Sequence, residues 1–495
     1  MPTHIGTGTT HPAGALPDRR RTVVVVGGGI TGLAAAWELA TNGPPATRVV
    51  VLEAAANVGG KLRTAELGGQ PVDLAADAVV ARRPEAVELC RELGLGDELV
   101  PPGTSGASVW ARGRLRRLPE GLVLGVPTRW WPLARSGILG PAGLLRAAAD
   151  LAGTVPHGPR RRLGEPGSDR SVGAVVQRRL GRQVVARLAD PLIGGIHAGC
   201  VSTMSGAAVF PQLLAADDAT RGLMRGLRAT TPGASAPRTG AGPAFVTVRG
   251  GLGRLVERLV EALTARGVVV RTSTPVGPLR AAGGRWVVPA GEGAVVEADA
   301  VVLAVPAPAG ADIVGAVDAA LAAELRAIAY SGVCLVTMRW PSAALAELPE
   351  GTGFLVPVEQ GLLLTAATWL SVKWPHLARP GEMLVRASSG RHGDDRAMQL
   401  DDDALVRRVT AELASIMRTS GTPLESMVTR WPMAFPQYAV GHLDRVARMD
   451  RLAGQLPAPL ALAGAALHGV GVPACIGSGR AAARTVAAMP DDPPP

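Results

Sequence analysis

Short apolar runs alternate with helical segments in the first hundred residues of the chain. Residues 22–26 and 49–52 are continuous apolar runs rich in valine, which is typical of strands covered on both faces. Residues 33–40 lie between them and have a helical pattern. A strand, a helix and a strand in this order form a βαβ unit, whose right-handed crossover makes the two strands parallel neighbours. The pattern therefore predicts an α/β fold.

The same pattern returns later in the chain. A helix is predicted at residues 252–266, followed by a strand at 268–271 and a buried strand at 300–305. Near the C-terminus, a strand at 460–463 leads through a glycine-rich turn into a last helix at 480–488. We therefore predict one discontinuous nucleotide-binding domain, assembled from residues 21–100, 244–307 and 455–488.

Two further regions are predicted between these segments. Residues 101–215 form a largely helical subdomain that includes a short hairpin at 109–118. Residues 308–454 form a substrate-binding domain with antiparallel strands and one helix, at 333–340, 354–357, 362–369 and 403–418. Gly, Thr, Ala and Pro are frequent in 216–243, which predicts a mobile surface connection. Residues 1–20 and 489–495 are predicted to be disordered tails.

Composition narrows the class of ligand. The chain has 495 residues, of which 47% are hydrophobic and 19% charged, as in a globular protein. Its formal net charge of +10 comes almost wholly from arginine, since Lys61 and Lys373 are the only lysines. Such a field attracts anions. Because no nucleic-acid motif accompanies it, we expect a polyanionic small molecule and no nucleic acid.

Several classes of protein are excluded by what the sequence does not contain. The four cysteines lie far apart without CxxC or Cys/His clusters, which argues against a disulfide framework or a metal site and suits a cytoplasmic protein. Residues 459–479 are uncharged but rich in glycine. A buried strand and a turn that lead into a helix are therefore a more economical interpretation of this segment than a membrane span. Membrane contact is at most peripheral, through Trp130 and Trp131, and the favoured interpretation is that these residues line a cleft or pack inward.

A glycine motif between the first strand and helix predicts a dinucleotide site. It comprises Gly27, Gly28, Gly29, Ile30, Thr31 and Gly32. The first glycine of such a motif allows the tight turn, the second lets the backbone approach the pyrophosphate, and the third allows close helix–strand packing. The helix N-terminus then offers free N–H groups to the phosphates. Glu53, at the end of the second strand, is placed to accept hydrogen bonds from ribose hydroxyls.

The residues after Glu53 favour FAD over NAD. Gly59, Gly60 and Lys61 resemble the second half of the extended motif of amine oxidase-like flavoproteins, where a Gly-Gly pair lets the backbone lie along the cofactor. The resemblance implies an α/β fold with an FAD-binding Rossmann-like domain, an inserted α+β substrate domain and a helical subdomain.

Over nearly its whole length the chain resembles the bacterial protoporphyrinogen and coproporphyrinogen oxidases, most closely the high-GC Gram-positive members. The segments that carry the resemblance include DPLIGGIHAGCVSTMSGAAVFPQL at 190–213, RWPMAFPQYAVGHLDR at 430–445 and HGVGVPACIGSGRAAA at 468–483. It implies that FAD contacts Gly60, Lys61, Val276, Gly464, Val470, Gly471 and Val472, and that substrate contacts Asp77, Arg82, Gly195 and Trp369. The chain departs from the family pattern at Ala75, Ala76, His197, Cys200 and Ala474.

The resemblance also implies a reaction. Hydride leaves a methylene bridge of a porphyrinogen for flavin N5, a pyrrole N–H proton is lost, and oxygen reoxidises the flavin to give peroxide; three rounds yield the porphyrin. The flavin carries this chemistry, which is consistent with the lack of a Ser/His/Asp or paired-carboxylate pattern. His442 is a candidate proton acceptor, although a structural hydrogen bond is the favoured role for it.

The substrate is expected to be coproporphyrinogen III, whose four propionates suit a basic protein, with product hand-over to a ferrochelatase. Gram-positive members as a group make haem through coproporphyrin. Alternatives are protoporphyrinogen IX oxidation, an amine oxidase or carotenoid desaturase on the same scaffold, and a non-catalytic protein that binds flavin or porphyrin.

Overall fold

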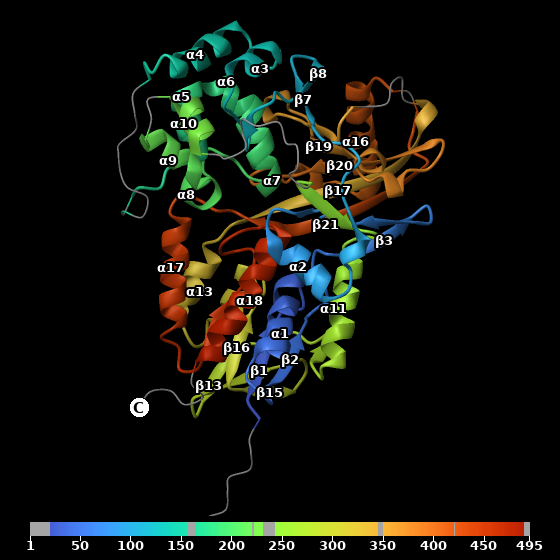
Figure 1. Ribbon diagram of the computed structural model, residues 1–495. Helices are drawn as coiled ribbons and strands as arrows, with labels where there is room; N and C mark the ends of the chain where they lie inside the picture. The colour runs from blue at the N-terminus through green and yellow to red at the C-terminus, as the bar shows by residue number, and fades with distance from the viewer. Residues whose placement is uncertain are drawn as a thin grey trace, which may run out of the picture.

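The computed structural model describes residues 20–155, 165, 167–219, 222–230, 243–344, 350–419 and 421–489. Figure 1 shows a parallel α/β body at one end of the molecule, a group of helices at the other end and a large sheet beside that group. The tails predicted at 1–20 and 489–495 lie outside the described residues, except for Arg20 and Met489.

The α/β body is built on a five-stranded parallel sheet. Its strand order is β12 (Val269–Arg271), β2 (Arg48–Leu52), β1 (Thr22–Val26), β16 (Ala300–Leu303) and β22 (Leu460–Leu462). Strands far apart in sequence become neighbours, as where Val24 pairs with Val301 and Val301 with Leu460. The strands at 22–26, 49–52, 268–271, 300–305 and 460–463 were all predicted.

Alternate residues of β1 belong to two different cores, because successive side chains of a strand point to opposite faces. Val23 and Val25 pack with α1 (Ile30–Asn42), α11 (Gly253–Ala265) and α18 (Val472–Ala488). Val24 and Val26 pack with α12 (Ala307–Val314), α17 (His442–Ala453) and a small antiparallel sheet. The elements on this second face are β13 (Arg280–Ala282), β14 (Arg285–Pro289), β15 (Val295–Ala298), α12 (Ala307–Val314), α13 (Ala319–Arg326) and α17 (His442–Ala453).

The predicted domain boundary at residue 308 does not coincide with a change in packing. Residues 311–325 and 446–453 were assigned to the substrate-binding domain, yet their apolar side chains lie in the core on the second face of the parallel sheet. Local sequence pattern cannot show this, because it gives the apolar face of a helix and not the sheet that the face covers.

A seven-stranded sheet stands above the α/β body (Figure 1). Its neighbouring strands are antiparallel except for one parallel pair, β18 with β7. In spatial order they are β21 (Glu425–Pro436), β17 (Tyr330–Pro341), β20 (Glu382–Ser389), β19 (Leu364–Trp369), β18 (Gly353–Leu355), β7 (Ser108–Ala111) and β8 (Arg114–Arg117). The hairpin β7–β8 was placed in the helical subdomain and instead extends this sheet. Helix α16 (Asp402–Met417) was predicted, whereas β20 and β21 were not.

The helical region contains eight α-helices and a π-helix, η2 (Val185–Gly194), among the described residues. The helices are α3 (Trp130–Arg135), α4 (Pro141–Leu151), α5 (Val172–Leu180), α6 (Arg182–Val184), α7 (Gly195–His197), α8 (Gly206–Val209) and α9 (Pro211–Ala219). Helix α10 (Leu223–Thr230) follows, and smaller elements elsewhere include α2 (Pro84–Glu92), β3 (Thr64–Leu67), β4 (Gln70–Asp73), β5 (Val79–Val80), β6 (Leu99–Val100) and β11 (Phe245–Val248).

The mobile connection predicted at 216–243 is wrong where the structure describes it. Its first part lies in α9 and α10, and Asp217 is fully buried, with its carboxylate 2.6 Å from the guanidinium of Arg179. This ion pair fixes α9, and the sequence pattern does not reveal it. Residues 220, 221 and 231–242 lie outside the described residues.

The last helix begins earlier than predicted. Helix α18 starts at Val472, with Gly471 as its N-cap and a proline in its first turn, and not at Arg480. Gly479 lies inside this helix, at a point where it packs on α1. Glycine is required there because a Cβ would be 2.1 Å from the Thr31 carbonyl oxygen of α1. One of the glycines that suggested a longer turn, Gly479, therefore serves the packing of α18 on α1. In the part of the chain that the structure describes, no helix has the length and apolarity needed to cross a membrane.

Candidate functional site

The three spaced glycines of the motif have three different surroundings. A Cβ on Gly27 would lie 2.6 Å from the carbonyl oxygen of Ala304, and one on Gly32 would lie 1.9 Å from that of Gly27. These two glycines are required by packing. A Cβ on Gly29 would meet no described atom within 4 Å. Gly29 thus opens onto free space at the start of α1, where a ligand's pyrophosphate can approach the backbone.

The N-terminus of α1 offers its backbone N–H groups to that space. Gly29 is the N-cap, no side chain caps the helix, and its first turn has no acidic residue. Ile30 and Thr31 form that turn and are buried. Uncapped N–H groups and the positive end of the helix dipole favour an anion here. The residues present therefore fit the diphosphate of a dinucleotide.

Glu53 is held beside the glycine turn. Its carboxylate accepts hydrogen bonds from the backbone N–H groups of Gly28 at 2.6 Å and Ala55 at 2.8 Å. Its backbone N–H donates to Arg271, and its carbonyl accepts from Thr274. These two bonds hold the loop that contains Val276 beside the carboxyl end of β2. Val276 itself pairs with Ala290. Glu53, predicted to contact the ribose, and Val276, predicted to contact the adenine, thus both follow the carboxyl ends of neighbouring strands, β2 and β12.

The Gly-Gly pair lies against the motif. The N–H of Gly59 donates to the carbonyl of Gly28 at 2.8 Å, and Gly59 forms a parallel bridge with Gly29. Gly60 has a φ of 59°, and a Cβ there would be 3.3 Å from the Cα of Gly29. This contact brings the next residue, Lys61, from the α/β body to the wall of a cavity.

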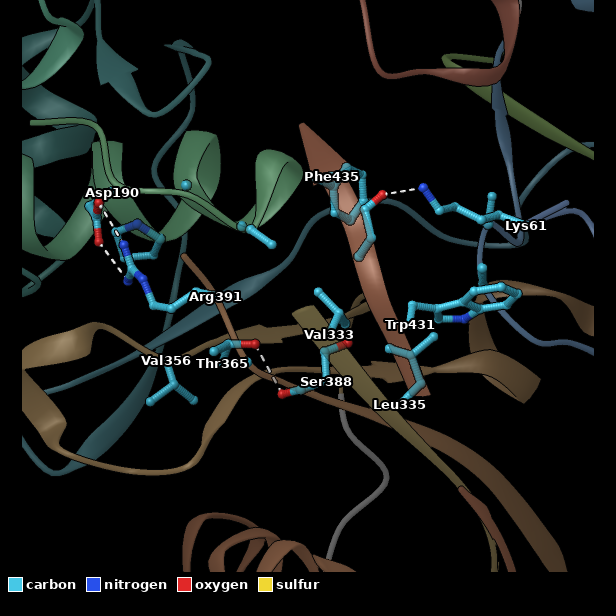
Figure 2. Close-up of a pocket in the computed structure, with 18 residues that line it drawn as sticks. Lys61, Asp190, Val333, Leu335, Val356, Thr365, Ser388, Arg391, Trp431 and Phe435 are labelled. Atoms are coloured by element: carbon cyan, nitrogen blue, oxygen red, sulfur yellow. Dashed lines mark hydrogen bonds and ion pairs between the residues drawn. The ribbon is translucent and has the colours of Figure 1, made fainter. Parts of the chain in front are cut away.

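The cavity has a volume of about 240 Å³ and lies where the α/β body, the helical region and the seven-stranded sheet meet (Figure 2). Lys61 lines it and donates from Nζ to the carbonyl of Ala434 at 2.6 Å. Burial lowers the pKa of this lysine. The other lining residues are Ala75, Ala76, Asp190, Pro191, Gly194, Gly195, Ala198, Val333, Leu335, Val356, Thr365, Ser388, Gly390, Arg391, Trp431, Ala434 and Phe435.

One part of the cavity wall carries an ion pair. Arg391 donates from its two terminal nitrogens to the carboxylate of Asp190, at 3.0 and 3.2 Å, and also to the carbonyl of Gly199. Both side chains are largely buried, with 15% of Arg391 and 11% of Asp190 exposed. Figure 2 shows the pair across the cavity from Lys61, with Val333 and Leu335 between them.

The rest of the wall is mostly apolar. Trp431 and Phe435 of β21 line it, and the indole N–H of Trp431 donates to the carbonyl of Leu74 at 3.0 Å. This bond fixes the backbone just before Ala75 and Ala76, two positions where the chain departs from the family pattern. Arg386 of β20 is buried and supports the same loop, since it donates to the carbonyl of Ala75 at 3.0 Å.

The predicted substrate residues are not brought together. Gly195 lines the cavity. Trp369 does not, because it is 1% exposed and packs in the sheet core with its ring centroid 5.5 Å from that of Phe354. Asp77 accepts from Lys373 and Trp374, both at 2.8 Å, outside the cavity wall. Despite its burial, the pKa of Asp77 falls to about 2 because of the cations Lys373 and Arg386. Arg82 is exposed.

His442 is buried away from the cavity wall. Its Nε2 donates to the carbonyl of Leu467 at 2.8 Å, and its ring stacks on Tyr438. Burial lowers its pKa to about 4. This geometry suits the structural hydrogen bond, and it does not place His442 beside a substrate.

The sequence analysis missed the ion pair and the aromatic wall. Asp190 and Trp431 were part of the quoted segments but were not singled out, and Arg391 was outside them. The sequence does offer one signal for Asp190, which is a charged residue in a mostly apolar segment. Such a segment is usually buried, and a buried charge usually needs a partner of opposite charge. Among the described residues, no group of three His, Cys, Asp or Glu side chains is placed to hold a metal ion.

Comparison with known proteins decides the family. Residues 30–487 match the family of flavin containing amine oxidoreductases. A coproporphyrinogen III oxidase of Bacillus subtilis is 32% identical over 94% of this chain and 98% of its own length. The chain belongs to the coproporphyrinogen III and protoporphyrinogen oxidase family of flavin-containing amine oxidoreductases.

Two further relatives support this family assignment, and a third protein shares the fold. A coproporphyrinogen III oxidase of Propionibacterium freudenreichii is 35% identical over 98% of this chain and 94% of its own. A crystal structure from Exiguobacterium sp. 255-15, provisionally named a protoporphyrinogen oxidase, is 31% identical and superposes with a TM-score of 0.83 over 94% of this chain and 98% of its own. Cyclohexylamine oxidase of Brevibacterium oxydans, at 17% identity, shares the fold with a TM-score of 0.68 over 95% of this chain and 99% of its own.

Proposed function

We propose that this protein is an FAD-dependent oxidase that converts coproporphyrinogen III to coproporphyrin III with oxygen as acceptor. The observation that carries the proposal is the cavity between the nucleotide-binding body and the seven-stranded sheet, lined by Lys61 on one side and by Arg391 on the other. Relatives about one third identical to this chain over nearly its full length are named coproporphyrinogen III oxidases, which supports this substrate.

The chain's own residues would hold FAD along one line. Gly29 and the start of α1 would bind the pyrophosphate, Glu53 the ribose hydroxyls, and the loop at Val276 the adenine. Lys61 and the turn before α18 would border the isoalloxazine. The other positions proposed to contact FAD, including residues of that turn, are Gly27, Gly28, Ile30, Thr31, Gly32, Gly60, Gly464, Val470, Gly471 and Val472. When bound, the flavin supplies a two-electron acceptor for the hydride that leaves the methylene bridge.

The lining of the cavity has the chemistry to contact part of a tetrapyrrole. Its apolar wall, including Val333, Leu335 and Trp431, can contact the macrocycle and exclude water. Asp190 can accept a hydrogen bond from a pyrrole N–H, and Arg391 can donate to a propionate carboxylate. In each round the substrate loses a hydride from carbon and a proton from nitrogen, and three rounds with three oxygen molecules remove six electrons.

The tetra-anionic substrate is favoured over protoporphyrinogen IX by charge. The chain has a formal net charge of +10, and the hairpin β7–β8 carries exposed arginines at 112, 114 and 117. A positive surface raises the encounter rate with a polyanion, more strongly at low ionic strength. Oxygen as acceptor, cytoplasmic location and hand-over of product to a ferrochelatase stay predictions.

The first measurement compares kcat/KM for the two porphyrinogens. The second follows anaerobic bleaching of the flavin absorption band at about 450 nm on addition of substrate. We expect bleaching by porphyrinogen and a higher kcat/KM for coproporphyrinogen III. Equal or better use of protoporphyrinogen IX would reverse the substrate choice. Bleaching by an amine alone would favour an amine oxidase, for which Trp431 and Phe435 could supply aromatic contacts. Absence of any bleaching would favour a non-catalytic protein.

Arg391 provides a second test. Arg391→Lys keeps the charge but loses the bidentate geometry, so we expect KM for coproporphyrinogen III to rise about tenfold with a smaller change in kcat. Arg396→Lys is the matched control, because Arg396 is exposed and pairs with Asp394 outside the cavity wall. An equal effect of both changes would contradict a role of Arg391 in substrate binding.

A further inference from the structure

The turn between β22 and α18 has little regular structure of its own. It spans residues 464–471 and contains Gly464 at a φ of 124° and Gly469 at a φ of 153°, values that favour glycine. Within the turn, Leu467 N–H donates to Gly464 at 3.3 Å. Two side chains from another part of the chain, Tyr438 and His442, satisfy three further backbone groups of this turn.

Tyr438 spans the turn with one oxygen atom. Its hydroxyl donates to the carbonyl of Ala465 at 2.5 Å and accepts from the N–H of Gly469 at 2.7 Å. Only a neutral phenol can do both at once. Burial raises the pKa of Tyr438, which is 4% exposed, and so keeps the phenol neutral.

His442 holds the residue midway between those two contacts. Its Nε2 donates to the carbonyl of Leu467, and its ring lies 4.0 Å from that of Tyr438 at an angle of 13°. Burial is the main reason that its pKa is lowered to about 4; His468 and Arg445 lower it further, whereas Asp169 and the bond to Leu467 raise it. A neutral imidazole with its proton on Nε2 therefore contacts the turn.

The backbone around the stacked pair is fixed from the helical region. The N–H of Ser205 donates to the carbonyl of Tyr438 at 2.7 Å, and the N–H of Gly441 donates to Asp169 at 2.8 Å. A few residues earlier, Ala434 accepts the hydrogen bond from Lys61. The segment 434–442 thus reaches both Lys61 and the turn, two parts of the flavin site proposed above.

We propose that Tyr438 and His442 are positioning residues that set the shape of the turn 464–471 and thereby the surroundings of the flavin ring. The inference rests on the proposed FAD site. Neither residue is among those that line the cavity; both act through the three backbone groups of the turn. Removing these contacts changes the flavin environment and lets the turn open more often, while the rest of the fold is retained.

Tyr438→Phe is the first test, with Tyr330→Phe as a matched control. These are the only two tyrosines of the chain, and Tyr330 accepts through its hydroxyl from the N–H of Ala307 at the start of α12, not from the turn. In the purified flavin-containing protein, we expect amide hydrogen exchange in 464–471 to become at least about tenfold faster in Tyr438→Phe. The flavin absorption spectrum and midpoint potential should shift more in this variant than in Tyr330→Phe.

A histidine pair of variants tests the second contact. His442→Gln keeps a side-chain N–H near Leu467, and His442→Leu removes it. We expect the Leu variant to show the faster exchange and the larger spectral shift, with partial rescue in the Gln variant.

Two outcomes would overturn the inference. One is unchanged exchange at 464–471 in Tyr438→Phe and His442→Leu. The other is faster exchange with no change in the flavin spectrum and potential, which would leave only a structural role. If the wild-type protein binds no flavin, the proposed function fails, and the role at the flavin site fails with it. Exchange in 464–471 would then still show whether the contacts hold the turn.

Discussion

The buried imidazole of His442 should make folding stability depend on pH in a way that one substitution removes. Burial lowers its pKa from 6.5 in the unfolded chain to about 4 in the folded protein. Between these values the unfolded chain binds a proton and the folded protein does not, so the free energy of unfolding falls as the pH drops. The full difference in pKa corresponds to about 3.4 kcal/mol, because one pKa unit is about 1.36 kcal/mol.

Most of this effect lies in an accessible range. Between about pH 7.5 and about pH 5, the contribution of His442 falls by about 2 kcal/mol. His442 is 3% exposed, so solvent screening reduces this figure little. Asp73 acts in the opposite direction, because burial raises its pKa to about 6 and the folded protein then binds the additional proton.

The assay compares wild-type protein with His442→Gln at the two pH values. Glutamine does not titrate, whereas Asp73 is present in both proteins, so its effect cancels in the difference. Acidification should lower the midpoint of thermal unfolding about 2 to 4 °C more in the wild type than in the variant. An identical shift in both proteins would refute the reasoning, since it would mean that His442 has the same pKa in the folded and unfolded states.

Three further changes have expected outcomes. Gly32→Ala should abolish flavin binding or prevent folding, as judged by the purified protein's absorption spectrum, because its Cβ would lie 1.9 Å from the Gly27 carbonyl oxygen; a normally loaded variant would contradict this. Trp369→Ala should reduce stability by about 3–5 kcal/mol through a core cavity, measured by chemical unfolding, with KM unchanged; a raised KM would return Trp369 to the substrate site. Asp77→Asn should lower the unfolding midpoint by leaving Lys373 without its 2.8 Å partner, and an unchanged midpoint would show that the pair contributes nothing.

The nucleotide half of the fold could be predicted because its signals are local. A strand buried on both faces must be continuously apolar, and Gly32 is required by a contact within one strand–turn–helix unit, since a Cβ there would meet the Gly27 carbonyl oxygen. The contact that requires Gly27 is with Ala304, at the end of a distant strand, but the motif spacing already marks this position. The same holds for Glu53, which lies at the carboxyl end of the next strand and bonds back to Gly28. The sequence by itself therefore determined the cofactor class and, through resemblance over the whole chain, the family.

Only the tertiary structure decided which residues form the cavity. Asp190 and Arg391 are 201 residues apart and become an ion pair because η2 and the loop after β20 meet at one wall. Trp369, which the resemblance placed at the substrate, faces the core instead, since alternate residues of a strand point to opposite faces. Sequence pattern gives the period of a strand, but the face that meets the cavity depends on how the sheet packs on the rest of the chain.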